Sequence, residues 1–191
     1  MLTVLVIDES RSRAGEICAG LALAGYQVAA ILADVDNLSA EVERLRPDVI
    51  LIDTDSPSRD TLEHLATMNK HMPRPVVIFT QEEGEETIRD ALKAGVSAYI
   101  VDGLETKRIK PIVEVARARF EDTQALRREL DAMSQKLSDR KLVEKAKGVL
   151  MKARGLDEDA AYHAMRKLAM ERGQTLVKVA RDVIDMARVL L

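Results

Sequence analysis

The sequence predicts a doubly wound α/β domain with a five-stranded parallel sheet, followed by a coiled-coil helix and a three-helix bundle. Apolar runs of strand length recur through the first 110 residues, and segments with helical spacing of apolar residues separate them. Strands that are apolar on both faces are typical of a parallel sheet covered by helices on both sides. After residue 107 the chain holds one proline and no glycine before Gly148, which predicts a long helix.

The expected strands are residues 2–7, 28–32, 49–52, 76–79 and 98–101. Helical segments precede Gly25 and Gly95, which stand where a helix C-cap is expected. The long helix is expected from Lys107 to about Leu150, with Pro111 in its first turn. If the strands take the order 2-1-3-4-5, the first and third strands are neighbours and their acidic carboxyl ends meet in one pocket.

Composition excludes several classes of protein. Of 191 residues, 47% are apolar and 3% aromatic, and Cys18 is the single cysteine, so a disulfide framework and a cysteine-rich zinc site are excluded. Tryptophan is absent, which leaves few platforms for stacking bases of single strands. The sequence shows no membrane span or signal peptide, so we expect a cytoplasmic protein without a membrane partner.

Charge divides the chain into two parts. Residues 1–135 hold 16 Lys and Arg against 24 Asp and Glu, whereas residues 136–191 hold 13 against 8. This asymmetry indicates two modules, of which the smaller faces an anion. An ordinary solvated helical surface is the alternative explanation of the charge.

Carboxylates follow two of the strands that the expected order makes neighbours. Asp8 and Glu9 end the first strand and Asp53 ends the third. Three crowded carboxylates repel one another, and Mg²⁺ is the usual counter-charge for oxygen ligands, so the sequence predicts a magnesium pocket. Asp53 is best placed to become an aspartyl phosphate. Alternatively, these acidic residues only cap the helices that follow the strands.

These strand ends resemble the response-regulator receiver domain, whose fold is flavodoxin-like, over about residues 1–115. The resemblance implies that Asp8 and Glu9 hold the metal and that Asp53 is the phospho-acceptor. It also implies that Thr80 and Tyr99 are switch residues. The family's fifth strand ends in a lysine that pairs with the phosphoryl group, and here Asp102 stands in its place. A degenerate receiver that is switched by a protein partner is therefore an alternative to phosphorylation.

The long helix carries an apolar seam whose members are spaced by four, three and four residues: Leu126, Leu130, Met133 and Leu137. This spacing is typical of a left-handed coiled coil and predicts a homodimer. Packing of the same stripe against the protein's own domains is the alternative.

Three helices with small apolar residues are expected in residues 138–191, with Asp157 as a cap and Gly155 and Gly173 as stops. We interpret Met151, Met165 and Met170 as core residues. Cations cluster along the first of these helices, with Lys141 and Lys145 near one face. A basic face on a helical bundle is suited to contact with the phosphate backbone of a nucleic acid. A solvated face that binds no ligand is the alternative interpretation.

The stretch from Arg140 to Ile184, with its AKGVLM run, is similar to the ANTAR module, the RNA-binding domain named after the antitermination regulators AmiR and NasT. The sequence is most similar to the NasT branch, which implies control of nitrate and nitrite assimilation. The expected domains are a receiver at 1–115, a coiled-coil linker at 116–137 and an ANTAR domain at 138–191. With the charge pattern, the resemblance gives these RNA-binding candidates: Lys141, Lys145, Lys147, Gly148, Arg166, Lys178 and Arg181.

The resemblance implies a transcription antiterminator that binds paired stem-loops in leader RNA, is gated by its receiver and has a sensor protein or histidine kinase as partner. A DNA-binding response regulator is the main alternative, but residues 175–191 offer few side chains suited to base edges. A regulator held inactive by a sensor protein is another. No second catalytic group accompanies Asp53, so we do not expect an enzyme.

Overall fold

The computed structural model describes residues 1–8, 13–101 and 106–190. The chain divides into two compact units, Met1–Gln124 and Ala125–Leu191. Helix α5 (Thr106–Arg154) contributes to both units. Among the described residues, no helix is both long and apolar enough to cross a membrane.

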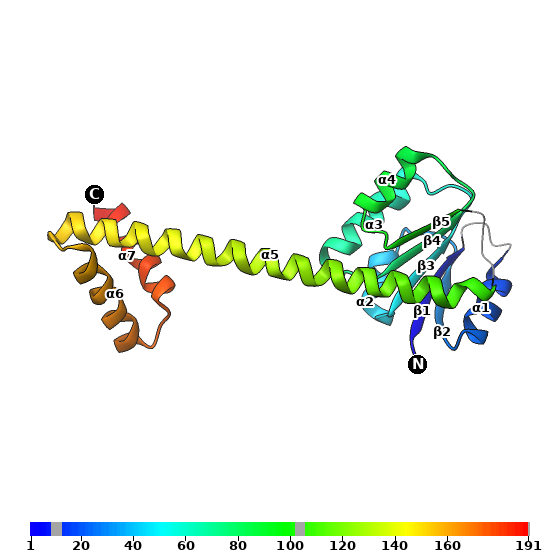
Figure 1. The fold of residues 1–191 in the computed structure, drawn as a ribbon, viewed down its shortest axis with the longest axis horizontal. Coiled ribbons are helices and arrows are strands. Elements are labelled where there is room, and N and C mark those ends of the chain that lie inside the picture. Colours follow the sequence, from blue (N-terminus) through cyan, green and yellow to red (C-terminus); the bar gives the residue numbers. More distant parts are fainter. Residues whose placement is uncertain (9–12, 102–105, 191) are drawn as a thin grey trace. The chain divides into compact units, whose positions relative to one another are not determined.

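The first unit is a five-stranded parallel sheet, which confirms the predicted fold class, and its order β2-β1-β3-β4-β5 is the one on which the carboxylate pocket depends (Figure 1). The strands are β1 (Thr3–Asp8), β2 (Gln27–Leu32), β3 (Val49–Asp53), β4 (Val76–Thr80) and β5 (Ala98–Val101). The helices between them are α1 (Ala14–Leu23), α2 (Leu38–Leu45), α3 (Arg59–His71) and α4 (Glu85–Lys93). Every residue of β3 and β4 is buried, as expected for strands with helices on both faces.

Alternate residues of the strands point to two cores. Leu5 and Ile7 pack with residues of α2, α3 and α4, whereas Val4 and Val6 pack with residues of α1 and α5. Helix α5 enters the second core through three fully buried side chains, Ile109, Val113 and Ala116. The first turns of α5 are therefore part of the receiver-like unit.

Two glycines follow helices at positive φ, Gly25 at 86° and Gly95 at 95°, as their position after the helices predicted. Gly95 is also needed for space, because a Cβ there would lie 2.2 Å from Nδ2 of Asn69. That amide donates hydrogen bonds to the carbonyls of Ala94 and Gly95, each at 3.0 Å. The contact joins α3 to the turn before β5.

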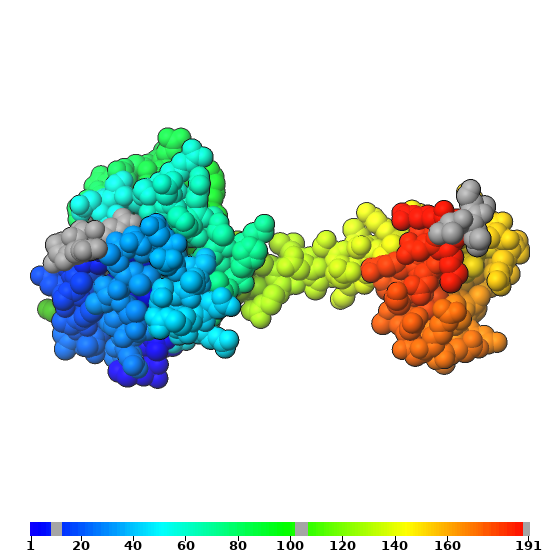
Figure 2. All heavy atoms as spheres, turned by 180° about the vertical axis from the view of Figure 1, so that it is seen from behind, coloured from blue at the N-terminus to red at the C-terminus, as the bar shows by residue number. Residues whose placement is uncertain are grey.

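The second unit contains the end of α5, α6 (Glu158–Arg172) and α7 (Leu176–Leu190). Helices α6 and α7, orange and red, pack side by side (Figure 2). The Asp157 side chain accepts a hydrogen bond from the Ala160 amide at 2.7 Å, and Gly173 ends α6 at φ 59°. These observations agree with the predicted cap and stop.

The core of this unit is small: Ala146, Met165, Ala169, Val179, Ala180 and Ile184 are buried in it. Met165 is 1% exposed, as predicted, but Met151 is 37% and Met170 76% exposed, so the interpretation of these two as core residues is wrong. Met170 is five residues after Met165, which places it about 140° around the helix from the buried face.

The predicted seam on α5 is exposed. The side chains of Leu126, Leu130, Met133 and Leu137 are exposed by 62, 65, 57 and 59%. The described residues of their own unit, 125–190, therefore do not cover these side chains. A second chain is the predicted cover.

Candidate functional sites

Two of the three predicted metal ligands lie side by side at the carboxyl edge of the sheet. Asp8 of β1 is paired in register with Asp53 of β3, and the two residues are 1% and 0% exposed. Adjacent parallel strands bring their ends together in this way, as the strand order predicted. The third ligand, Glu9, lies outside the described residues.

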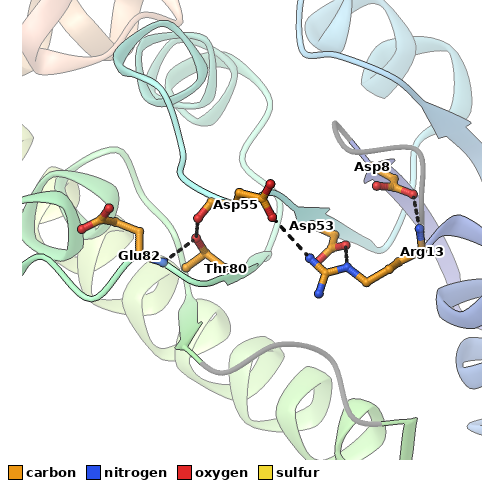
Figure 3. A network of polar contacts seen from close by, with 6 residues as sticks. All are labelled: Asp8, Arg13, Asp53, Asp55, Thr80 and Glu82. Atoms are coloured by element: carbon orange, nitrogen blue, oxygen red, sulfur yellow. Dashed lines mark hydrogen bonds and ion pairs between the residues drawn. The ribbon is translucent and has the colours of Figure 1, made fainter.

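Arg13, the N-cap residue of α1, reaches into this pocket (Figure 3). Its Nε lies 2.9 Å from Oδ2 of Asp53, and its Nη2 lies 3.8 Å from Oδ1 of Asp55. Its backbone amide donates a hydrogen bond to Oδ2 of Asp8 at 3.3 Å. Part of the helix-capping alternative is therefore true of Asp8, whose carboxylate receives an amide at the start of α1.

Asp53 is an incompletely compensated buried carboxylate. Neither of its oxygens has a well-aligned hydrogen-bond partner among the described residues, although Arg13 is close enough to form an ion pair. Burial raises the pKa of Asp53 above its ordinary value; Arg13 opposes this shift, and the negative charges of Asp8 and Asp55 add to it. The carboxylate therefore lies where an additional positive charge would stabilise it.

The pocket offers the donors that a hard divalent cation prefers. Two adjoining carboxylates supply oxygen ligands, and both buried oxygens of Asp53 lack hydrogen-bond partners within the described ranges. The residues therefore fit magnesium. The described residues contain no group of three or more Asp, Glu, His or Cys side chains that could hold a metal, so the third protein ligand rests on Glu9 as a prediction.

The predicted switch residues Thr80 and Tyr99 meet at the loop after β4. The hydroxyl of Thr80 donates to the carbonyl of Asp55 at 2.9 Å and accepts from the amide of Glu82 at 3.1 Å (Figure 3). The hydroxyl of Tyr99 donates to the carbonyl of Glu82 at 3.1 Å, and burial raises the pKa of Tyr99. Glu82 thus links the two side chains. Asp102 lies outside the described residues.

The predicted RNA-binding cations of the second unit fall into two groups. Lys141, Lys145, Arg166 and Arg181 are exposed, and none forms an ion pair with another described residue. Lys178 is also exposed but pairs with Asp182 at 3.0 Å. Gly148 lies in α5, where a Cβ would meet nothing within 4 Å, so close packing does not require a glycine there.

Lys147 differs from these cations. It is 8% exposed, and its Nζ lies 2.8 Å from Oε1 of Glu144 and 2.7 Å from Oε1 of Glu158. Hydrogen bonds to Glu144 and Glu158 raise the pKa of Lys147. The ammonium of Lys147 links α5 to α6 through these two carboxylates. In this position it makes a structural contact and is not free to bind a phosphate.

Comparisons with known proteins agree with the division of the chain into two units. Residues 4–114 match the model of the response regulator receiver domain, and residues 131–184 match that of the ANTAR domain. The transcriptional regulatory protein PdtaR of Mycobacterium tuberculosis is 30% identical over 161 residues, which cover 84% of this chain and 78% of that protein. The nitrate regulatory protein of Klebsiella oxytoca is 35% identical over 85 residues, 44% of this chain and 22% of that protein.

Solved structures match the first unit. A CheY-like receiver domain protein from Methanospirillum hungatei has a TM-score of 0.56 at 20% identity, covering 64% of this chain and 98% of that one. The receiver domain of a modulated diguanylate cyclase from Desulfovibrio desulfuricans has a TM-score of 0.56 at 21% identity, covering 63% and 98%. At these identities the likeness shows the fold alone. The sequence matches to both modules show more: this chain belongs to the ANTAR response regulators of two-component systems, proteins that regulate transcription.

Proposed function

We propose that this protein is a cytoplasmic transcription antiterminator whose helical unit binds paired stem-loops in a leader RNA. The main support is the ANTAR match over residues 131–184, on a unit in which several exposed cations have no carboxylate partner among the described residues, although Lys167, Lys178 and Arg188 do have one. Four such cations, Lys141, Lys145, Arg166 and Arg181, are available to phosphates. The similarity to a nitrate regulatory protein supports nitrate and nitrite assimilation as the regulated process.

The receiver controls this activity through Asp53. In the proposed reaction a carboxylate oxygen of Asp53 forms a bond to phosphorus as the bond between phosphorus and its donor, a histidine kinase, breaks. Asp8, Glu9 and Asp53 would hold magnesium, which when bound would supply positive charge to the phosphoryl oxygens. Thr80 and Tyr99 lie one loop away, where the hydrogen bonds to Asp55 and Glu82 can change.

Dimerisation through α5 completes the proposal. A second copy of the exposed seam Leu126, Leu130, Met133 and Leu137 is its natural cover, because a heptad stripe is complementary to itself. Two helical units in one dimer then match two stem-loops in one RNA.

Affinity selection of cellular RNA on the purified full chain tests the function. We expect recovery of leader transcripts with two neighbouring stem-loops, and weaker binding when one of the two loops is deleted. A DNA hairpin of the same sequence is the control. Equal or tighter binding of duplex DNA, or recovery of RNA without shared structure, would contradict the proposal and favour the DNA-binding alternative.

A further inference from the structure

Arg13 holds both described carboxylates of the phosphorylation pocket, and no sequence motif assigns it a role. Its backbone amide contacts Asp8, while its guanidinium contacts Asp53 at 2.9 Å and Asp55 at 3.8 Å (Figure 3). The side chain is 27% exposed, whereas that of Asp53 is 0% exposed. A partly solvated cation therefore covers a buried anion.

We infer that Arg13 is an internal counter-ion that holds Asp53 in the metal-free receiver and competes with magnesium for it. The inference rests on the proposed cation site at Asp53. It adds a specific residue to that site, because the divalent cation must displace a guanidinium that belongs to the chain.

The geometry explains why the two cations exclude each other. Oδ2 of Asp53 is in contact with Nε of Arg13, and a metal on that oxygen would bring two positive centres within a few ångströms in a buried place. The guanidinium compensates Asp53 only in part, since neither carboxylate oxygen receives a well-aligned hydrogen bond from the described residues. A doubly charged ion can therefore replace it.

Asp55 is an alternative ion-pair partner for the displaced guanidinium of Arg13. Its side chain is 82% exposed and already lies 3.8 Å from Nη2 of Arg13. A change of side-chain rotamer can carry Arg13 from the buried carboxylate to the exposed one without moving α1. The cost of this displacement lowers the apparent affinity for magnesium, as for any ligand that binds only the competent state.

Calorimetric titration of the full chain with MgCl₂ tests the inference, using the parent, Arg13→Gln, Asp53→Asn and the control Arg89→Gln. Arg89 is an exposed receiver arginine that pairs with Glu85, so its variant removes the same charge elsewhere. We expect Arg13→Gln to bind magnesium about tenfold more tightly than the parent, which corresponds to about 1.4 kcal/mol. The control should match the parent, and Asp53→Asn should bind weakly or not at all.

Melting in EDTA gives a metal-free readout of the same pair. We expect Arg13→Gln to lower Tm in the parent and to have little effect in the Asp53→Asn background, because the partner is gone. Additive Tm shifts, or equal magnesium affinities of the parent and Arg13→Gln, overturn the inference and leave the magnesium site intact. Absence of magnesium binding from the parent and Arg13→Gln overturns the proposed metal site itself, whatever the Tm cycle shows.

Discussion

Asp53 in the first unit and Lys147 in the second are both buried charged side chains near a functional motif, and their charges are compensated differently. Asp53 is fully buried against a single guanidinium, with no well-aligned hydrogen bond from the described residues. Lys147 is nearly as buried but lies between two carboxylates at 2.7 and 2.8 Å. A buried charge that is fully paired stabilises a fold, whereas one that is poorly paired marks a place where a ligand supplies the missing charge.

Exposed groups follow the same distinction. The seam of α5 is an apolar surface without a described cover, and Lys141, Lys145, Arg166 and Arg181 are cations without described partners. If incomplete compensation marks binding sites, changes at these groups should alter binding more than stability. The converse should hold at Lys147.

The largest effect is expected at the seam. Leu130→Glu combined with Leu137→Glu places four charges in the proposed dimer interface, and burial of each leucine is worth about 1.5–3 kcal/mol. Sedimentation velocity at micromolar concentration should show a dimeric parent and a monomeric variant. Ala132→Glu with Gln135→Glu adds the same charge on the exposed opposite side of α5 and should leave the dimer intact. A dimeric seam variant would place the interface elsewhere.

RNA affinity should separate the exposed from the buried cations. Lys141→Glu combined with Lys145→Glu should weaken the binding of a stem-loop RNA by more than about tenfold. The slope of log affinity against log salt should become shallower by the amount expected for the loss of about two phosphate contacts. Lys147→Met should leave both nearly unchanged, because its ammonium already binds Glu144 and Glu158. Fluorescence anisotropy at several salt concentrations measures both quantities. A large loss at Lys147 with unchanged circular dichroism would break the comparison.

Stability should respond with opposite signs. Asp53→Asn removes a buried charge and leaves Arg13 able to turn to solvent, so we expect it to raise the free energy of unfolding by about 1 kcal/mol in metal-free buffer. Lys147→Glu places a third carboxylate between Glu144 and Glu158 and should lower Tm by several degrees. Scanning calorimetry resolves the two effects. If Lys147→Glu raised Tm, the ion pair between Lys147 and Glu158 would not be what holds α5 to α6.

The smallest expected effect is the pH dependence. Burial raises the pKa of Asp53 from 3.8, so the folded receiver holds more protons than the unfolded chain as pH rises above about 4, and stability falls through that window. Lys147 lowers the pKa of Glu158 from 4.5, so its contribution is complete above that pH and is lost on acidification. The Tm difference between the parent and Asp53→Asn, and that between the parent and Glu158→Gln, should therefore change in opposite directions between about pH 3 and 6. Parallel changes would contradict the assignment.

Periodicity predicted most of the fold, because its signals are local. The five apolar runs became strands within one residue of their expected ends, and Gly25, Gly95, Asp157 and Gly173 end or begin helices as their chemistry requires. The meeting of Asp8 with Asp53 followed from strand order alone. The Arg13 contact did not, since the sequence places arginines at 11 and 13 and contains nothing that selects one of them.

The burial of Lys147 was indicated by the helical period of the sequence, but the interpretation followed its charge and its motif position instead. Val143 lies four residues before it and Leu150 three residues after, so the helical period places Lys147 beside the apolar face of α5. The motif position and the positive charge favoured RNA contact instead. Neither reports burial, and the partner Glu158 belongs to the next helix.

The exposed middle of α5 links the stability of its helical backbone to dimerisation. Nearly all of residues 121–141 are exposed, and Ala116 and Ala146 are the nearest fully buried residues of α5 on either side. An unsupported helix of this length is marginal in water, because propensity alone barely offsets the entropy of ordering its residues. In a monomer these amides should exchange hydrogen with solvent far faster than those of Ile109 to Ala116, and dimerisation should slow them. In the proposed dimer the partner chain would stabilise this segment, and the hydrogen exchange of its amides would then measure how many chains are paired.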